Sequence, residues 1–131
     1  MKKLVVVLVL ALSAAVSFAQ SITKVELAKD NGKGKPGDLV KSFSTSDNPI
    51  HCVVNLKGLE TPLLFTGTLI AVNAERYRNF TVATTNISSV MGTTSMDFKF
   101  GVAKAWPAGT YRFEVKSTNG KLEKEFSFEI K

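Results

Sequence analysis

The residues best suited to chemistry in this chain are its one histidine and its one cysteine, His51 and Cys52, which are neighbours in the sequence. A serine or cysteine hydrolase needs a nucleophile that faces a histidine base. Both residues lie in the run from Ile50 to Leu56, which has the alternation of a β-strand, and successive side chains of a strand point to opposite faces. We therefore expect Cys52 to be a small buried hydrophobic residue and His51 to be a hydrogen-bonded surface residue.

Metal binding is the second chemistry that these side chains suggest. A copper or zinc site needs three or four converging donors, such as imidazole, thiolate or thioether groups. Besides His51 and Cys52, the chain offers Met91 and Met96 after its first twenty residues, and Met96 alternates with Phe98 in a pattern that places it in the core. We expect neither a metal site nor a cofactor.

Paired carboxylates are a third route to catalysis. The acidic residues that fall in expected loops or on an exposed strand face are Asp30, Asp38, Asp47, Glu60, Glu75 and Asp97. Nothing in their spacing brings two of them together, and scattered acids are typical of a soluble surface. The glycine-rich segment 32–37 lacks the spacing and the following helix of a phosphate-binding loop. We expect that the protein is not an enzyme.

One segment indicates recognition of a partner. The run Arg-Tyr-Arg-Asn-Phe that begins at Arg76 interleaves cations and aromatic rings in an expected connection between strands. Such residues are enriched where proteins bind partners or anionic sugars. The candidate binding residues are therefore Arg76, Tyr77, Arg78 and Trp106. The alternative is that Tyr77 or Phe80 anchors the connection to the core, and that Trp106 caps an end of the domain.

Short β-strands are expected to position these side chains. Apolar residues recur at every second position in short runs that turn residues interrupt, and no segment shows a helical period. Residues 63–72 are nearly all apolar and fit either a buried strand or a piece of helix, but Thr66 and Gly67 favour the strand. The expected strands span 22–28, 39–43, 50–57, 63–72, 80–87, 96–100, 111–115 and 122–130. Strands of this number and spacing predict two packed sheets, with a closed barrel as the alternative.

The C-terminal region carries the clearest pattern. Apolar and polar residues alternate through 111–115 and again through 126–130, on either side of Asn119 and Gly120. Asn-Gly is the preferred pair for a two-residue hairpin turn with positive φ. We therefore predict a tight β-hairpin that closes the domain.

The run Trp106-Pro107-Ala108-Gly109-Thr110-Tyr111, together with this hairpin, resembles the closing strands of bacterial immunoglobulin-like and fibronectin-like domains. In those domains a Pro-x-Gly-x-Tyr segment enters the penultimate strand, and the tyrosine hydroxyl ties the corner. The resemblance implies an all-β, immunoglobulin-like sandwich of two antiparallel sheets with about seven to eight strands. It implies a fold and not a function, because many unrelated proteins share that fold.

The same region is also similar to periplasmic copper-resistance proteins of the C type. Those proteins hold copper with histidines at the mature N-terminus and near the turn between the last two strands. Here Gln20 takes the first place, and Asn119-Gly120-Lys121 takes the second. The resemblance therefore does not carry a copper site over to this chain.

The first nineteen residues have the pattern of a bacterial secretory signal peptide. Two lysines precede an apolar run from Leu4 to Leu12, and a small-x-small cleavage site ends at Ala19. The run is shorter than the roughly 20 residues of a membrane span. We expect residues 1–19 to be removed and residues 20–131 to form one domain, in the periplasm or outside the cell. Since Cys52 is the only cysteine, no internal disulfide is expected.

Charge and export limit the classes of partner. The chain has 17 Lys and Arg against 11 Asp and Glu; Lys2 and Lys3 are expected to leave with the signal peptide, which makes the balance 15 − 11 = +4, and the basic residues are dispersed rather than clustered. Such an excess falls short of a nucleic-acid footprint. We expect no nucleic-acid partner and no membrane span after processing. By elimination, the expected function is that of an exported, non-catalytic module that binds a protein or cell-envelope partner. The alternative is a periplasmic carrier or sensor of a small ligand or of copper.

Overall fold

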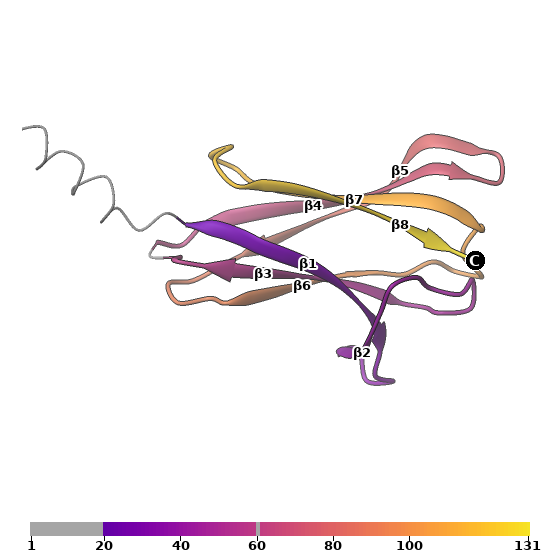
Figure 1. The fold of residues 1–131 in the computed structure, drawn as a ribbon, viewed down its shortest axis with the longest axis horizontal. Coiled ribbons are helices and arrows are strands. Elements are labelled where there is room, and N and C mark those ends of the chain that lie inside the picture. Colours follow the sequence, from indigo (N-terminus) through magenta and orange to yellow (C-terminus); the bar gives the residue numbers. More distant parts are fainter. Residues whose placement is uncertain (1–19, 60) are drawn as a thin grey trace, which may run out of the picture.

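Eight β-strands form two four-stranded antiparallel sheets in the computed structural model, which describes residues 20–59 and 61–131 (Figure 1). The first sheet has the order β2-β1-β3-β6, and the second has the order β5-β4-β7-β8. The strands are β1 (Ser21–Asp30), β2 (Pro36–Val40), β3 (Ile50–Lys57), β4 (Leu64–Ala74), β5 (Tyr77–Ser88), β6 (Ser95–Phe100), β7 (Gly109–Ser117) and β8 (Glu123–Ile130). The predicted all-β sandwich is confirmed, whereas the predicted signal peptide lies outside the described residues.

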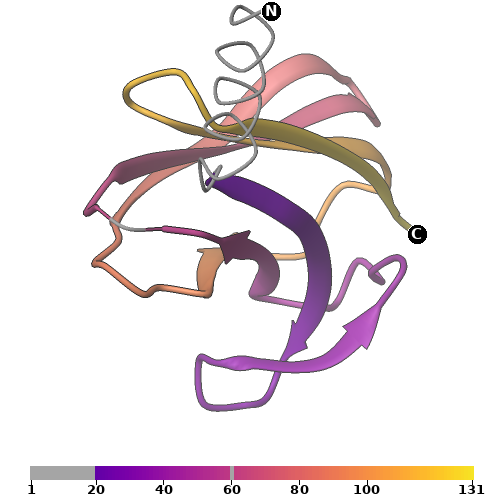
Figure 2. The same ribbon diagram turned by 60° about the vertical axis from the view of Figure 1, so that its left-hand side comes forward.

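The core lies between the two layers, which Figure 2 shows one above the other. It is built from the alternating residues that each strand turns inward, as in β3, where Ile50, Cys52 and Val54 are fully buried. The rings of Phe98 and Phe113 meet across the sandwich with their centroids 5.4 Å apart. Within the described residues, no helix is long and apolar enough to cross a bilayer.

Strand β4 approaches the opposite sheet closely at Gly67. A Cβ at this position would lie 2.7 Å from Cε2 of Phe98, against Cδ2 of the same ring, and 3.0 Å from Cε1 of Phe113. The glycine therefore leaves room for two aromatic rings of the core. The strand interpretation of residues 63–72 is confirmed, and Gly67 serves packing rather than a turn.

The corner that leads into β7 has the contact that the resemblance implies. The hydroxyl of Tyr111 donates to the carbonyl of Pro107 over 2.6 Å. The ring of Trp106 packs edge-on against Tyr111, with the centroids 5.9 Å apart. The Trp106 indole is 2% exposed and donates to the carbonyl of Asp47 over 2.7 Å, so it closes one end of the sandwich.

The turn between β7 and β8 lies between the predicted strands 111–115 and 122–130. The amide of Ser117 donates to the carbonyl of Leu122 over 2.8 Å, so that Thr118 to Lys121 lie between the paired ends. Gly120 has the expected positive φ of 75°. The side chain of Asn119 accepts the amide of Lys121 at 3.0 Å, so the loop is wider than the two-residue turn that Asn-Gly favours.

Two other connections differ from the sequence prediction. Ala74 pairs with Tyr77, so the predicted polar connection over 73–79 is a tight hairpin with only Glu75 and Arg76 at its tip. Neither tip residue is a usual turn residue, so the sequence pattern did not indicate a tight turn there. Strand β2 also begins and ends earlier than the predicted 39–43, and Phe43 instead forms a parallel bridge with Ile130 of β8.

We predict that Gly67→Ala lowers the free energy of unfolding by about 1–3 kcal/mol, because the added methyl group overpacks the core against Phe98. Chemical denaturation followed by circular dichroism measures the change. The control is Thr68→Ala, on the other face of the same strand, which we expect to cost less than about 1 kcal/mol. Equal costs for the two variants would contradict the close approach at Gly67.

Candidate functional site

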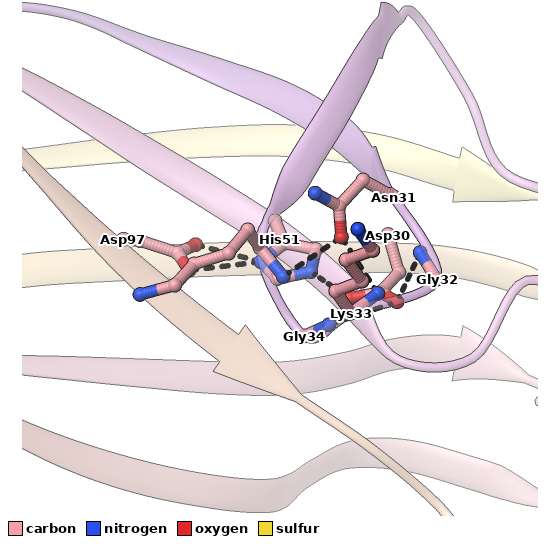
Figure 3. A network of polar contacts seen from close by, with 8 residues as sticks. Asp30, Asn31, Gly32, Lys33, Gly34, His51 and Asp97 are labelled. Carbon is pink, nitrogen blue, oxygen red and sulfur yellow. Dashed lines mark hydrogen bonds and ion pairs between the residues drawn. The ribbon is translucent and has the colours of Figure 1, made fainter.

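The histidine is the centre of a polar network on the outer face of the first sheet (Figure 3). Nδ1 of His51 lies 2.8 and 3.0 Å from the two carboxylate oxygens of Asp97 on β6, and Nε2 lies 2.7 Å from Oδ1 of Asp30 at the end of β1. Each ring nitrogen therefore has a carboxylate as its hydrogen-bond partner. The imidazole therefore links β1 and β6 across the strand between them.

His51 is fully buried, so the prediction of a surface histidine is wrong in location, although the ring is hydrogen-bonded as predicted. The cover is the loop that joins β1 to β2. Oδ2 of Asp30 accepts the amides of Gly32 at 2.8 Å and Gly34 at 3.3 Å, which folds this loop over the ring. The hydrogen bond with His51 has the largest effect on the pKa of Asp30. Together with the two amide hydrogen bonds, it holds that pKa below its usual value.

The expectation that no two carboxylates come together is also wrong, because Asp30 and Asp97 flank the same ring. Both nitrogens of His51 are occupied, so neither is available to act as a base on a substrate. Cys52 points into the core on the other face of β3, as predicted, and burial raises the pKa of its thiol. A protonated, enclosed thiol is a poor nucleophile. The hydrogen bonds of His51 to Asp30 and Asp97 therefore tie three strands together.

Metal coordination has no support from these groups. In residues 20–59 and 61–131, no cluster of three or more His, Cys, Asp or Glu side chains is placed to hold an ion. Met96 is in the core, as predicted, while Met91 is 69% exposed on the connection between β5 and β6. Met96 is therefore buried and Met91 exposed, and the side chains of Cys52 and His51 point to opposite faces of β3.

An apolar pocket lies where the edge strand β5 meets the connection between β6 and β7. Its volume is about 170 Å³, and its lining consists of Ala71, Tyr77, Phe80, Val82, Val102, Trp106, Pro107 and Tyr111. The structure thus brings together two predicted binding residues, Tyr77 and Trp106, that are far apart in the sequence. Figure 1 shows the β4–β5 hairpin at the end of the sandwich where the chain also terminates.

Phe80 is the exposed member of this pocket. Its ring is 50% exposed and lies 5.1 Å from the ring of Tyr77, centroid to centroid. It pairs with Ala71, which faces the core, but β5 is an edge strand, so the ring stays half exposed at the edge of the sheet. The prediction placed Phe80 at the start of a strand and did not name it as a binding residue. The run of aromatic residues after Arg76 was the available signal.

The two predicted arginines have different surroundings. The guanidinium carbon of Arg76 lies 5.1 Å from the centroid of the Tyr77 ring, and Nη2 donates to the Tyr77 hydroxyl over 3.2 Å. Arg78 instead donates through Nη1 to the carbonyls of Glu75 at 2.6 Å and Tyr77 at 2.9 Å. Arg76 therefore lies beside the pocket, and Arg78 holds the hairpin turn.

We predict that Asp30→Asn lowers the melting temperature near pH 7, and that its difference from the wild type narrows as the pH falls below about 4. A carboxyl whose pKa is lowered by folding stabilises the protein above its unfolded pKa, and this contribution is lost as the pH falls through the folded value. Thermal melts from pH 7 to about pH 2 measure the effect. Asp38→Asn in the exposed strand β2 is the control, and equal curves for the two variants would contradict the role of Asp30.

Comparison with known proteins defines the fold. No protein-family model and no curated protein matches the sequence. Among solved structures, the chain is similar to an immunoglobulin-like protein from Pseudomonas aeruginosa, with a TM-score of 0.51 and 13% identity, over 88% of this chain and 99% of that one. A β-glucosidase from Kluyveromyces marxianus matches with a TM-score of 0.41 and 17% identity, over 83% of this chain and 14% of the enzyme. The chain is an immunoglobulin-like β-sandwich, as its closing strands predicted.

Proposed function

We propose that this domain is a non-catalytic binding module that is exported from a bacterial cell and recognises a protein or cell-envelope partner. The observation that carries the proposal is the half-exposed ring of Phe80 beside an apolar pocket. Exposed apolar surface next to a concave site is typical of places where proteins meet partners. The export part rests on the signal-peptide pattern of residues 1–19.

The pocket favours one kind of contact from the partner. Its walls are aromatic and aliphatic, and its volume of about 170 Å³ suits a single apolar side chain. Arg76 lies beside Tyr77, and among the described residues no carboxylate lies within 4.0 Å of its guanidinium. A partner that inserts an apolar side chain and places an acidic group near Arg76 would use both features.

The other predicted binding residues fit this proposal unequally. Tyr77 would contact the ligand together with Phe80, since both line the pocket from β5. Trp106 would form the inner wall, because its indole is 2% exposed and already donates to Asp47. Arg78 would act through the turn that its guanidinium holds. The non-catalytic part of the proposal is supported by His51, whose two ring nitrogens are both bound to carboxylates.

The proposal is tested by capture of a partner from a bacterial envelope extract on the immobilised wild type, followed by titration of the purified partner. We predict that Phe80→Asp weakens the affinity about tenfold or more, because a central aromatic anchor dominates such interfaces. The matched control is Val90→Asp, which places the same charge on another exposed apolar residue, one that does not line the pocket.

Thermal melts of both variants must match the wild type, so that loss of fold does not imitate loss of binding. Binding by Val90→Asp should equal that of the wild type. Two results would overturn the proposal. One is a folded wild type that retains no partner above background, and the other is equal affinity for the wild type and Phe80→Asp.

A further inference from the structure

The tip of the β4–β5 hairpin carries two opposite charges beside the aromatic pocket. Glu75 and Arg76 are the two tip residues, and Tyr77 directly after them lines the pocket. Glu75 has a φ of 53°, a conformation that asparagine or glycine adopts at lower cost than glutamate does. The chain therefore keeps a charged side chain at a position where the backbone favours another residue type.

The carboxylate of Glu75 lies against one wall of the pocket. Its Oε2 accepts the amide of Ala108 at 3.4 Å, and Ala108 follows Pro107, which belongs to the lining. Burial raises the pKa of Tyr111 to about 12, and the nearby Glu75 and Tyr77 add to this rise. The negative charge of Glu75 is therefore close to the wall that Pro107 and Tyr111 form.

The guanidinium group of Arg76 lies at the Tyr77 wall of the same pocket. Its carbon is 5.1 Å from the centroid of the Tyr77 ring, and Nη2 donates to the Tyr77 hydroxyl over 3.2 Å. Among the described residues, neither Arg76 nor Glu75 forms an ion pair. One cation and one anion without ionic partners thus border a pocket with an apolar lining.

We propose that this pocket binds a free apolar α-amino acid, such as leucine. The side chain of the ligand fills the pocket, its α-carboxylate pairs with Arg76, and its α-ammonium group pairs with Glu75. The two charges identify this occupant, because an amino acid carries a cation and an anion on the same carbon atom as its side chain. Charge-assisted hydrogen bonds of this kind are stronger than neutral ones.

Size and charge disfavour other small ligands. The pocket volume of about 170 Å³ is below the roughly 300–1,000 Å³ of sites for drug-sized molecules. An apolar acid satisfies Arg76 but places its charge near that of Glu75, and an apolar amine satisfies Glu75 but is repelled by Arg76. A neutral apolar molecule uses neither charge. A zwitterion with one apolar side chain therefore fits the pocket best.

The inference goes beyond the proposed function, because its ligand is a free small molecule and not a protein or cell-envelope partner. Both ligands use the same pocket, since the partner also inserts an apolar side chain beside Tyr77 and Phe80. The amino acid and the partner therefore compete, and a high concentration of the amino acid weakens capture of the partner. Binding of the amino acid itself can be measured with no partner present.

Titration of the purified protein with L-leucine tests the site. Trp106 is the only tryptophan of the chain and lines the pocket, so its fluorescence reports occupancy. The NMR shifts of the Val82 and Val102 methyl groups, also in the lining, give a second readout. We expect a dissociation constant of about 1 mM, as for a weakly bound ligand of few atoms.

Three related compounds identify the groups that are recognised. N-acetyl-L-leucine lacks the ammonium group, L-leucinamide lacks the carboxylate, and glycine lacks the apolar side chain. Each should bind about tenfold more weakly than L-leucine, since one hydrogen bond between charged groups or one buried side chain contributes about that factor.

Two variants assign the charges of the site. Arg76→Gln should bind L-leucine about tenfold more weakly and should no longer distinguish it from L-leucinamide, whereas Glu75→Gln should no longer distinguish it from N-acetyl-L-leucine. The matched controls are Lys124→Gln and Glu125→Gln, which remove adjacent exposed charges on β8 outside the pocket and should keep the wild-type affinity. Thermal melts show whether all four variants are folded.

Three results would overturn the inference. They are a wild type that does not respond to L-leucine up to about 10 mM, related compounds that bind as tightly as L-leucine, and folded tip variants that keep both distinctions. None of them concerns the partner, which capture by the wild type and by Phe80→Asp tests separately. Failure of one proposal is therefore not mistaken for failure of the other.

Discussion

The close packing of two sheet faces against each other is the constraint on which the rest of this structure depends. Gly67 lets the rings of Phe98 and Phe113 fill the space between the sheets, and this contact sets how near β4 comes to β6. Once the inner residues are buried, the backbone polar groups of the strands pair within each sheet, and the polar side chains find their partners at an edge or on an outer face. The His51 network meets this requirement on the outer face of the first sheet.

The His51 network shows how an outer sheet face becomes buried in a small domain. A histidine at the second position of β3, on its outer face, would ordinarily face solvent, but the loop after β1 folds over it, and Asp30 binds both the ring and the loop amides. The carboxylate of Asp97 satisfies the second nitrogen. Three residues from three strands are thus joined by charge-assisted hydrogen bonds, which are stronger than neutral ones. The loop gains its conformation from the same contacts that bury the ring.

The sequence predicted the fold well because alternation is a local signal, and it predicted the site less well because the site is assembled from distant segments. Residues 50–57 were predicted as a strand with correct bounds, since burial of one face leaves a period of two. The cover over His51 was not predictable, because it depends on where a glycine-rich loop folds. The sequence did not predict the hairpin at Glu75 and Arg76, because neither is a usual turn residue. Tyr77 and Trp106 line one pocket because the strand order brings them together, and the alternation in the sequence does not reveal that order.

The placement of charge connects the edge strand to the pocket beside it. Soluble β-proteins usually place lysine or proline on a long edge strand, because an unprotected edge risks aggregation. The edge strands β2, β6 and β8 carry Pro36, Lys99 and Lys124, whereas β5 has no lysine or proline and is interrupted only by a register shift at Val82. The exposed ring of Phe80 lies on the same strand, so two features that oppose solubility occur together. A surface that keeps both is more simply explained by contact with another chain than by tolerance of two independent liabilities, because a single lysine in β5 would relieve the risk at the edge.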